Sequence, residues 1–107
     1  MITESEIVEA IGPLDADALQ RWIEHGWVLP QRDSDSLRFD PSDVARVRLI
    51  CELHYELRIE EDSLSVVLSL LDQLYATRRT LGALISAVEI EPDDVRARIA
   101  ALIKSRL

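Results

Sequence analysis

Apolar positions along this chain fall into periodic stretches, and the glycines and prolines lie almost entirely between them. The first two stretches have the 3.6-residue period of short helices, over residues 4–10 and about 16–25. Thr3 and Glu6 have the spacing of a capping box, and Asp15 is suited to cap the second helix. Two short helices joined by a tight turn predict a helix-turn-helix.

The pattern changes between Trp27 and Asp40. Two short runs of β-type residues, WVLPQ and SLRFD, flank the polar segment RDSDS, which predicts a small hairpin, or wing. Asp40 and Pro41 then favour the start of a third helix that continues to about Leu57. Apolar residues cover more of this helix than a small domain needs to bury, so we expect another element to pack there.

A longer helix is expected over residues 63–88, because apolar residues recur there in heptads. The predicted seam consists of Val67, Leu70, Leu71, Leu74, Leu81, Leu84 and Val88. Such a seam favours a coiled-coil contact with a second subunit, and packing on the third helix of the same chain is the alternative. A final helix should begin at Pro92.

The predicted fold class is therefore mainly α. A winged helix-turn-helix domain with a small β-hairpin wing is expected over residues 1–58. A dimerisation region, with a long helix and a short C-terminal helix, is expected over residues 59–107.

Charge and composition narrow the function. The 107 residues include 12 Lys and Arg against 20 Asp and Glu, a net charge of −8. An acidic surface repels phosphate and attracts basic partners, so nucleic acid is an unfavourable ligand. Cys51 is the only cysteine, which fits a reducing compartment. With no signal-peptide pattern and no apolar run of about 18 residues, we expect a cytoplasmic protein without a membrane span.

Catalytic residues find little support in the sequence. His25 and His54 have no carboxylate or thiol at metal-ligand spacing. Cys51 lies three residues before His54, but apolar surroundings and acidic neighbours should raise the pKa of its thiol. No glycine-rich phosphate loop is present. We expect no enzyme, no metal and no cofactor.

The order of these parts resembles the MerR family of winged-helix regulators. The matching residues are Trp22, Gly26, Val28-Leu29-Pro30, the wing step Arg38-Phe39, and Asp43-Val44 at the third helix. The resemblance implies a winged helix-turn-helix fold and a DNA-binding regulator. Residues 1–48, however, hold ten acidic residues against five arginines. Because phosphate contacts supply most of the affinity for DNA, this balance counts against DNA binding.

A narrower resemblance fits the charge. The chain is similar to chaperone-modulator proteins of the CbpM type in the segments WIEHGWVLP, FDPSDVARVRLICELHYEL and VVLSLLDQLYATRRTLGAL. This resemblance implies a homodimer that binds the J-domain of a DnaJ-class co-chaperone and inhibits its stimulation of Hsp70. A DNA-binding regulator and a dimeric interaction module such as an antitoxin are the alternatives.

Acidic and aromatic residues are the candidates for the partner-binding surface. The resemblance implies that the partner presents a basic helix, and an acidic protein that covers this helix would compete with Hsp70. Glu52 and Glu56 lie one turn apart on the third helix; alternatively they form a solvated face in which Arg48 pairs with Glu52. The remaining candidates are the acidic residues Asp15, Asp17, Glu24 and Asp43 and the apolar anchors Trp27, Leu29 and Tyr55.

Overall fold

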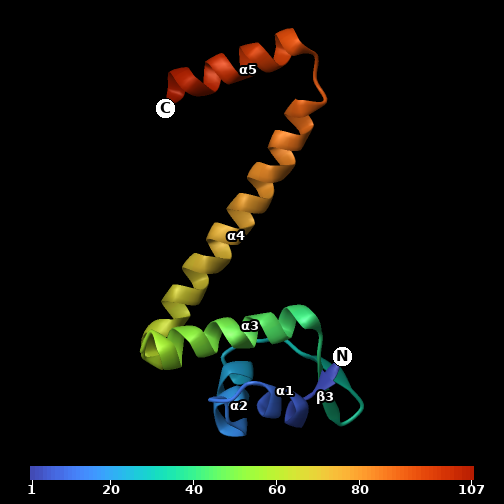
Figure 1. Cartoon of the computed structure of the whole chain (residues 1–107), viewed down its shortest axis with the longest axis vertical. Coiled ribbons are helices and arrows are strands. Elements are labelled where there is room, and N and C mark those ends of the chain that lie inside the picture. The colour runs from blue at the N-terminus through green and yellow to red at the C-terminus, as the bar shows by residue number, and fades with distance from the viewer. The chain divides into compact units, whose positions relative to one another are not determined.

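The computed structural model describes all residues from Met1 to Leu107. In chain order its elements are β1 (Ile2–Thr3), α1 (Glu4–Ala10), α2 (Ala16–Glu24), β2 (Gln31–Asp33), β3 (Ser36–Phe39), α3 (Pro41–Cys51), the π-helical segment η1 (Glu52–Glu56), α4 (Glu61–Glu89) and α5 (Asp93–Arg106) (Figure 1). The predicted mainly α fold class, a winged helix-turn-helix followed by a long and a shorter helix, is confirmed.

Two compact units make up the chain, the head (Met1–Leu68) and the tail (Ser69–Leu107). The head includes the first two turns of α4, because Leu64 and Leu68 are 0% and 2% exposed. The compact unit thus extends beyond residue 58, where the sequence suggested a domain boundary. The functional division at that boundary stays a prediction.

Local capping fixes the first two helices. The Thr3 hydroxyl accepts a hydrogen bond from the Glu6 N–H at 3.2 Å, and the Glu6 carboxylate accepts one from the Thr3 N–H at 3.3 Å. The Asp15 carboxylate accepts from the Ala18 N–H at 2.7 Å. Both predicted caps are confirmed, and each satisfies an N–H that a first helical turn leaves without a partner. After α2, Gly26 adopts a φ of 78°, which glycine tolerates without a steric penalty.

The wing is a three-stranded antiparallel sheet in the order β1-β3-β2. Ile2 pairs with Phe39 and Gln31 with Arg38. The second predicted strand agrees with β3, whereas the β2 strand begins only at Gln31, where the first predicted run ends. Val28 is buried in the core instead, and proline cannot donate to a strand ladder. The polar segment is therefore mostly strand, and the turn itself is short.

The core of the head is apolar throughout. Trp22 and Phe39 are its largest side chains and are 0% and 1% exposed. In Figure 1, α1 and α2 lie on the same side of α3, and β3 lies beside α1. The head thereby buries residues from α1, α2, β3 and α3, which gives α2 and the wing strand β3 fixed positions.

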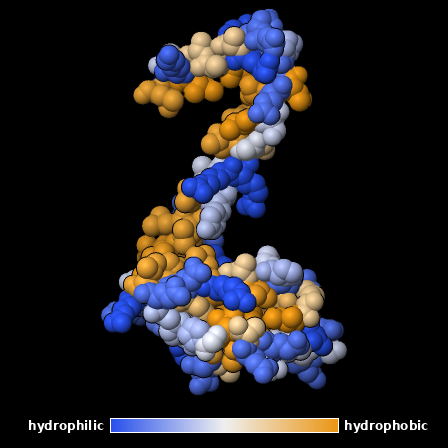
Figure 2. Space-filling view, in the orientation of Figure 1, coloured by the Kyte–Doolittle hydropathy of each residue, from blue (hydrophilic) through white to orange (hydrophobic).

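The tail differs in that none of its residues is buried. Figure 2 shows hydrophobic side chains on the surface of α4 and α5. Much of the predicted seam is exposed, with Leu70, Leu74, Leu81 and Leu84 between 44% and 61% accessible. None of the helices combines the length and the apolar character that crossing a membrane requires.

Candidate functional site

A broad concave surface of the head lies between α1, α2 and the wing. This wing groove has a volume of about 1010 Å³ and is lined by Thr3, Glu4, Ser5, Val8, Glu9, Ala16, Gln20, Arg32, Asp35, Ser36 and Leu37. In a helix-turn-helix protein the second helix, here α2, faces DNA. Here the groove beside α2 contains three carboxylates and one guanidinium, so its potential is unfavourable for phosphate.

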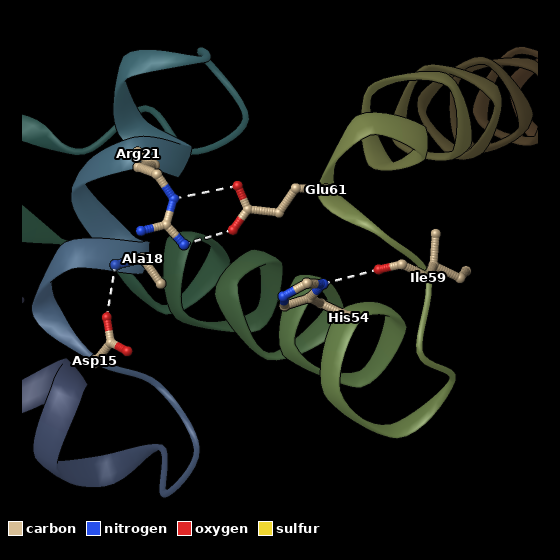
Figure 3. Close-up of polar contacts among 6 residues, drawn as sticks. All are labelled: Asp15, Ala18, Arg21, His54, Ile59 and Glu61. Atoms are coloured by element: carbon tan, nitrogen blue, oxygen red, sulfur yellow. Dashed lines mark hydrogen bonds and ion pairs between the residues drawn. The ribbon is translucent and has the colours of Figure 1, made fainter.

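The only basic residue of α2, Arg21, is held by a carboxylate of the head itself. Its guanidinium donates two hydrogen bonds to Glu61 at the start of α4, from Nε at 3.2 Å and from Nη2 at 2.6 Å (Figure 3). This hydrogen bonding lowers the pKa of Glu61 and raises that of Arg21. An arginine paired in this way offers less attraction to a phosphate.

The predicted acidic pair Glu52 and Glu56 lines a second hollow, the α3 pocket, of about 190 Å³. The turn after α1 forms the facing wall, and the full lining is Ala10, Ile11, Gly12, Pro13, Arg48, Cys51, Glu52 and Glu56. Both glutamates are exposed. Arg48 shares the pocket but forms no ion pair with Glu52, so the intrahelical pair considered as an alternative is absent.

These two hollows have no lining residue in common. The wing groove lies on the surface that faces DNA in helix-turn-helix proteins, and the α3 pocket lies at the end of α1 and α3. The head therefore carries two separate acidic surfaces.

Comparison with known families agrees with this architecture. The model of a family described as MerR HTH family regulatory protein matches residues 2–85. The chain belongs to this MerR family. The match covers all of the head except Met1, and the first part of the tail. No curated protein and no solved structure matches the chain.

A π-helical turn presents the acidic pair of this MerR-family protein. The Leu57 N–H donates to the Glu52 carbonyl at 2.9 Å, five residues earlier, where an α-helix would bond four residues earlier. The third helix, predicted to run to about Leu57, is thus an α-helix to Cys51 followed by η1. Single π-helical turns occur frequently at functional sites.

An aromatic cluster lies behind η1. The Trp22 ring meets His54 edge-on, with centroids 6.4 Å apart, and lies 6.3 Å from Tyr55. His54 Nδ1 lies 2.8 Å from the Ile59 carbonyl oxygen, which can only accept, so this nitrogen carries the proton (Figure 3). The Trp22 indole N–H has no partner within hydrogen-bonding distance and stabilises the Glu61 carboxylate at longer range.

Tyr55, one of the predicted anchors, is half-buried beside this cluster. Burial raises the pKa of its hydroxyl, and Asp15 adds to that shift. Trp27 is also half-buried and stacks on His25, with ring centroids 4.7 Å apart. Leu29 is 76% exposed and is the most accessible of the three anchors. None of these three residues lines the α3 pocket with Glu52 and Glu56.

The remaining predicted acids divide into two groups. Asp15 and Asp43 cap helices, because Asp15 accepts from Ala18 and Asp43 accepts from the Asp40 N–H at 3.0 Å. Burial raises the pKa of Asp43, and the hydrogen bond from the Asp43 N–H lowers that of Asp40. Asp17 and Glu24 are exposed on α2. Of these four acids, only Asp17 and Glu24 do not cap a helix.

Cys51 is a core residue, as the sequence predicted. Burial raises the pKa of its thiol to about 11, with a smaller rise from Glu52 and an opposing effect from Arg48. The thiol is therefore protonated at neutral pH and is a poor nucleophile. No group of three or more His, Cys, Asp or Glu side chains is placed to hold a metal ion.

Sequence reasoning missed the acids of the wing groove. Glu4 and Glu9 are five residues apart on α1, so a projection at about 100° per residue places them on different faces and does not group them. Asp35 joins them from the wing turn. That meeting depends on how the wing folds against α1, which no local pattern encodes.

Proposed function

We propose that this MerR-family protein is a chaperone modulator of the CbpM type. It acts as a homodimer that binds the J-domain of a DnaJ-class co-chaperone and inhibits the stimulation of Hsp70. The observation that carries the proposal is the wing groove, in which a helix-turn-helix fold combines three carboxylates with a single guanidinium. A regulator built this way is suited to a basic protein surface rather than to DNA.

Electrostatic competition provides the mechanism. A J-domain that presents a basic helix to Hsp70 would be attracted to the protein by the net charge of −8 of the whole chain. Once bound, the acidic surface covers the basic residues that Hsp70 requires. Charge complementarity acts mainly on the association rate and on the choice of partner, so inhibition should weaken as salt is added.

Glu52 and Glu56 are proposed contact residues. Both are exposed and line the α3 pocket. Since Arg48 is not engaged in an ion pair with Glu52, neither glutamate must lose an internal partner before it meets a lysine or arginine.

We propose that a second subunit packs against the tail and buries its apolar surface. The exposed leucines of α4 repeat at heptad spacing, and an isolated helix with such a face is poorly stable in water. Dimerisation through this seam would also present two heads to the partner.

Titration calorimetry with a purified J-domain tests the proposal, together with the J-domain-stimulated ATPase of Hsp70. We expect the protein to bind the J-domain and suppress the stimulated rate. Reversing two charges, Glu52→Lys with Glu56→Lys, should weaken binding by about tenfold, because two attractions become repulsions. The control Glu89→Lys with Glu91→Lys makes the same charge change in the tail and should bind like the wild type. Absence of wild-type binding would refute the proposal, and full affinity in the first variant would refute the role of the two glutamates.

A DNA-binding regulator is the second candidate, and membership in the MerR family favours it. Fluorescence titration with a DNA duplex at roughly 50 mM and 200 mM salt separates the two functions. A protein that neutralises 6–10 phosphates would lose on the order of 10³-fold or more in affinity between these conditions. We expect no measurable duplex binding at either salt concentration.

A further inference from the structure

The wing groove has the size and lining to hold a helix from another protein. We propose that it docks one basic amphipathic helix, seated where a helix-turn-helix protein would otherwise hold DNA. This inference rests on the proposed function, because the J-domain would supply the helix. Beyond that function, the inference specifies which surface of the head accepts the helix and which side chains contact it.

The volumes of the two acidic hollows of the head indicate which of them can accept a helix. An α-helix about 10 Å in diameter with a pitch of 5.4 Å occupies roughly 850 Å³ in two turns. The wing groove, at about 1010 Å³, accommodates such a segment. The α3 pocket, at about 190 Å³, does not and is limited to a single side chain.

The lining of the groove matches an amphipathic partner. Val8 and Leu37 are half-buried and, with Ala16, provide an apolar surface. Exposed carboxylates come from two different elements, Glu9 from α1 and Asp35 from the wing turn. A helix with an apolar stripe flanked by lysines or arginines would place the stripe on this surface and its cations near the carboxylates.

The charge of the groove selects a cation. Glu4, Glu9 and Asp35 are opposed by Arg32 alone, which leaves a net charge of −2 on the lining. The nearby base of α2, Arg21, does not alter this, since it is paired with Glu61. Three of the four charged residues of the lining therefore attract a basic helix, whereas only Arg32 among them attracts a DNA duplex.

Two variants of the full-length protein test the groove in different ways. Glu9→Lys with Asp35→Lys reverses its charge and changes the net lining charge from −2 to +2. Gln20→Trp leaves the charge unchanged and fills the groove from α2 with a bulky ring. Far-UV circular dichroism and thermal unfolding verify that each variant remains folded.

Calorimetry against the purified J-domain should show at least a tenfold loss of affinity for both variants. The loss in the charge-reversal variant should shrink as salt rises, and the loss in Gln20→Trp should not, because only the first is electrostatic. The tail variant Glu89→Lys with Glu91→Lys supplies the matched control. Wild-type affinity in both groove variants would overturn the inference.

The outcomes separate this inference from the function on which it rests. If the wild type binds the J-domain, and only Glu52→Lys with Glu56→Lys weakens binding, the groove is not the docking site but the chaperone function stands. If the wild type does not bind the J-domain at all, the proposed function fails first. If the wild type instead binds DNA and Gln20→Trp blocks that binding, the groove holds nucleic acid and the inference is wrong.

Discussion

The head and the tail of this protein differ in how far their apolar residues are buried. In the head, Trp22, Phe39, Leu64 and Leu68 are buried at 2% exposure or less. In the tail, α5 buries no residue at all, and the apolar groove of about 430 Å³ between α4 and α5 is open. The head buries its apolar residues within one chain, whereas the tail leaves an apolar surface exposed, which is the surface that the proposed dimer would bury.

The same contrast applies to polar groups. Capping and ion pairing fix the helices of the head, which carry the proposed contact residues, through the Asp15 and Asp40 caps and the Arg21–Glu61 pair. In the tail, by contrast, apolar side chains of α4 and α5 are exposed. We infer that specificity belongs to the head and assembly to the tail, and the following predictions test this separation.

The largest expected effect is in the core of the head. Trp22→Ala removes a side chain that is 0% exposed and should cost about 3–5 kcal/mol of the free energy of unfolding. Chemical denaturation measures this loss. The control Trp27→Ala, which removes a half-buried ring stacked on His25, should cost clearly less. Equal losses in the two variants would contradict the assignment of Trp22 as the centre of the core.

The next effect concerns the tail alone. Leu74→Asp with Leu81→Asp places two carboxylates in the proposed seam and should weaken dimerisation by about 2–4 kcal/mol, roughly 30- to 900-fold in Kd. Sedimentation velocity measures the oligomeric state. Tryptophan fluorescence should not change, because both tryptophans lie in the head. Ser69→Asp with Ala76→Asp, on the opposite face of α4, serves as the control, and an undisturbed dimer in the seam variant would show that the seam is misplaced.

A smaller effect is expected at a helix cap. Asp15→Ala deletes the acceptor of the Ala18 N–H and should cost about 1 kcal/mol of the free energy of unfolding. Asp17 lies in the first turn of the same helix and makes no capping hydrogen bond. Asp17→Ala should therefore lower the free energy of unfolding by less than Asp15→Ala does. Thermal unfolding compares the two variants, and a loss in Asp17→Ala as large as that in Asp15→Ala would argue against the cap.

The smallest effect is a dependence on acidic pH. Because hydrogen bonds from Arg21 lower the pKa of Glu61 below its ordinary value of 4.5, the folded state is favoured above that pH. This contribution disappears as the pH falls through the lowered pKa. Arg21→Ala should therefore flatten the acidic limb of the melting temperature plotted against pH. An identical limb in the wild type and the variant would show that the pair does not contribute.

Much of the fold is legible in the sequence because it depends on local rules. Thr3, Asp15 and Asp40 precede their helices as caps, and the structure uses all three. The first strand of the wing was misplaced because Val28 belongs to the core instead of to a strand. The two-residue β1 strand was missed, since a segment so short has no periodic pattern of its own.

The candidate site was less predictable. Residues on one helix could be grouped, and Arg48, Glu52 and Glu56 indeed line one pocket. Grouping fails across elements, so the contribution of Asp35 to the same groove as Glu9 was not foreseen. The π-helical turn that presents Glu52 was also missed, because helical projection assumes a constant 100° per residue.

By itself, the sequence determined the capped starts of α1, α2 and α3, the winged helix-turn-helix order and the acidic balance, since capping, periodicity and charge are properties of neighbouring residues. Only the tertiary structure decided that Arg21 is occupied by Glu61, forty residues away, and that carboxylates from α1 and the wing meet in one groove. Both contacts join segments that are distant along the chain. Their formation depends on the packing of the whole head around Trp22 and Phe39, which no single stretch of the sequence specifies.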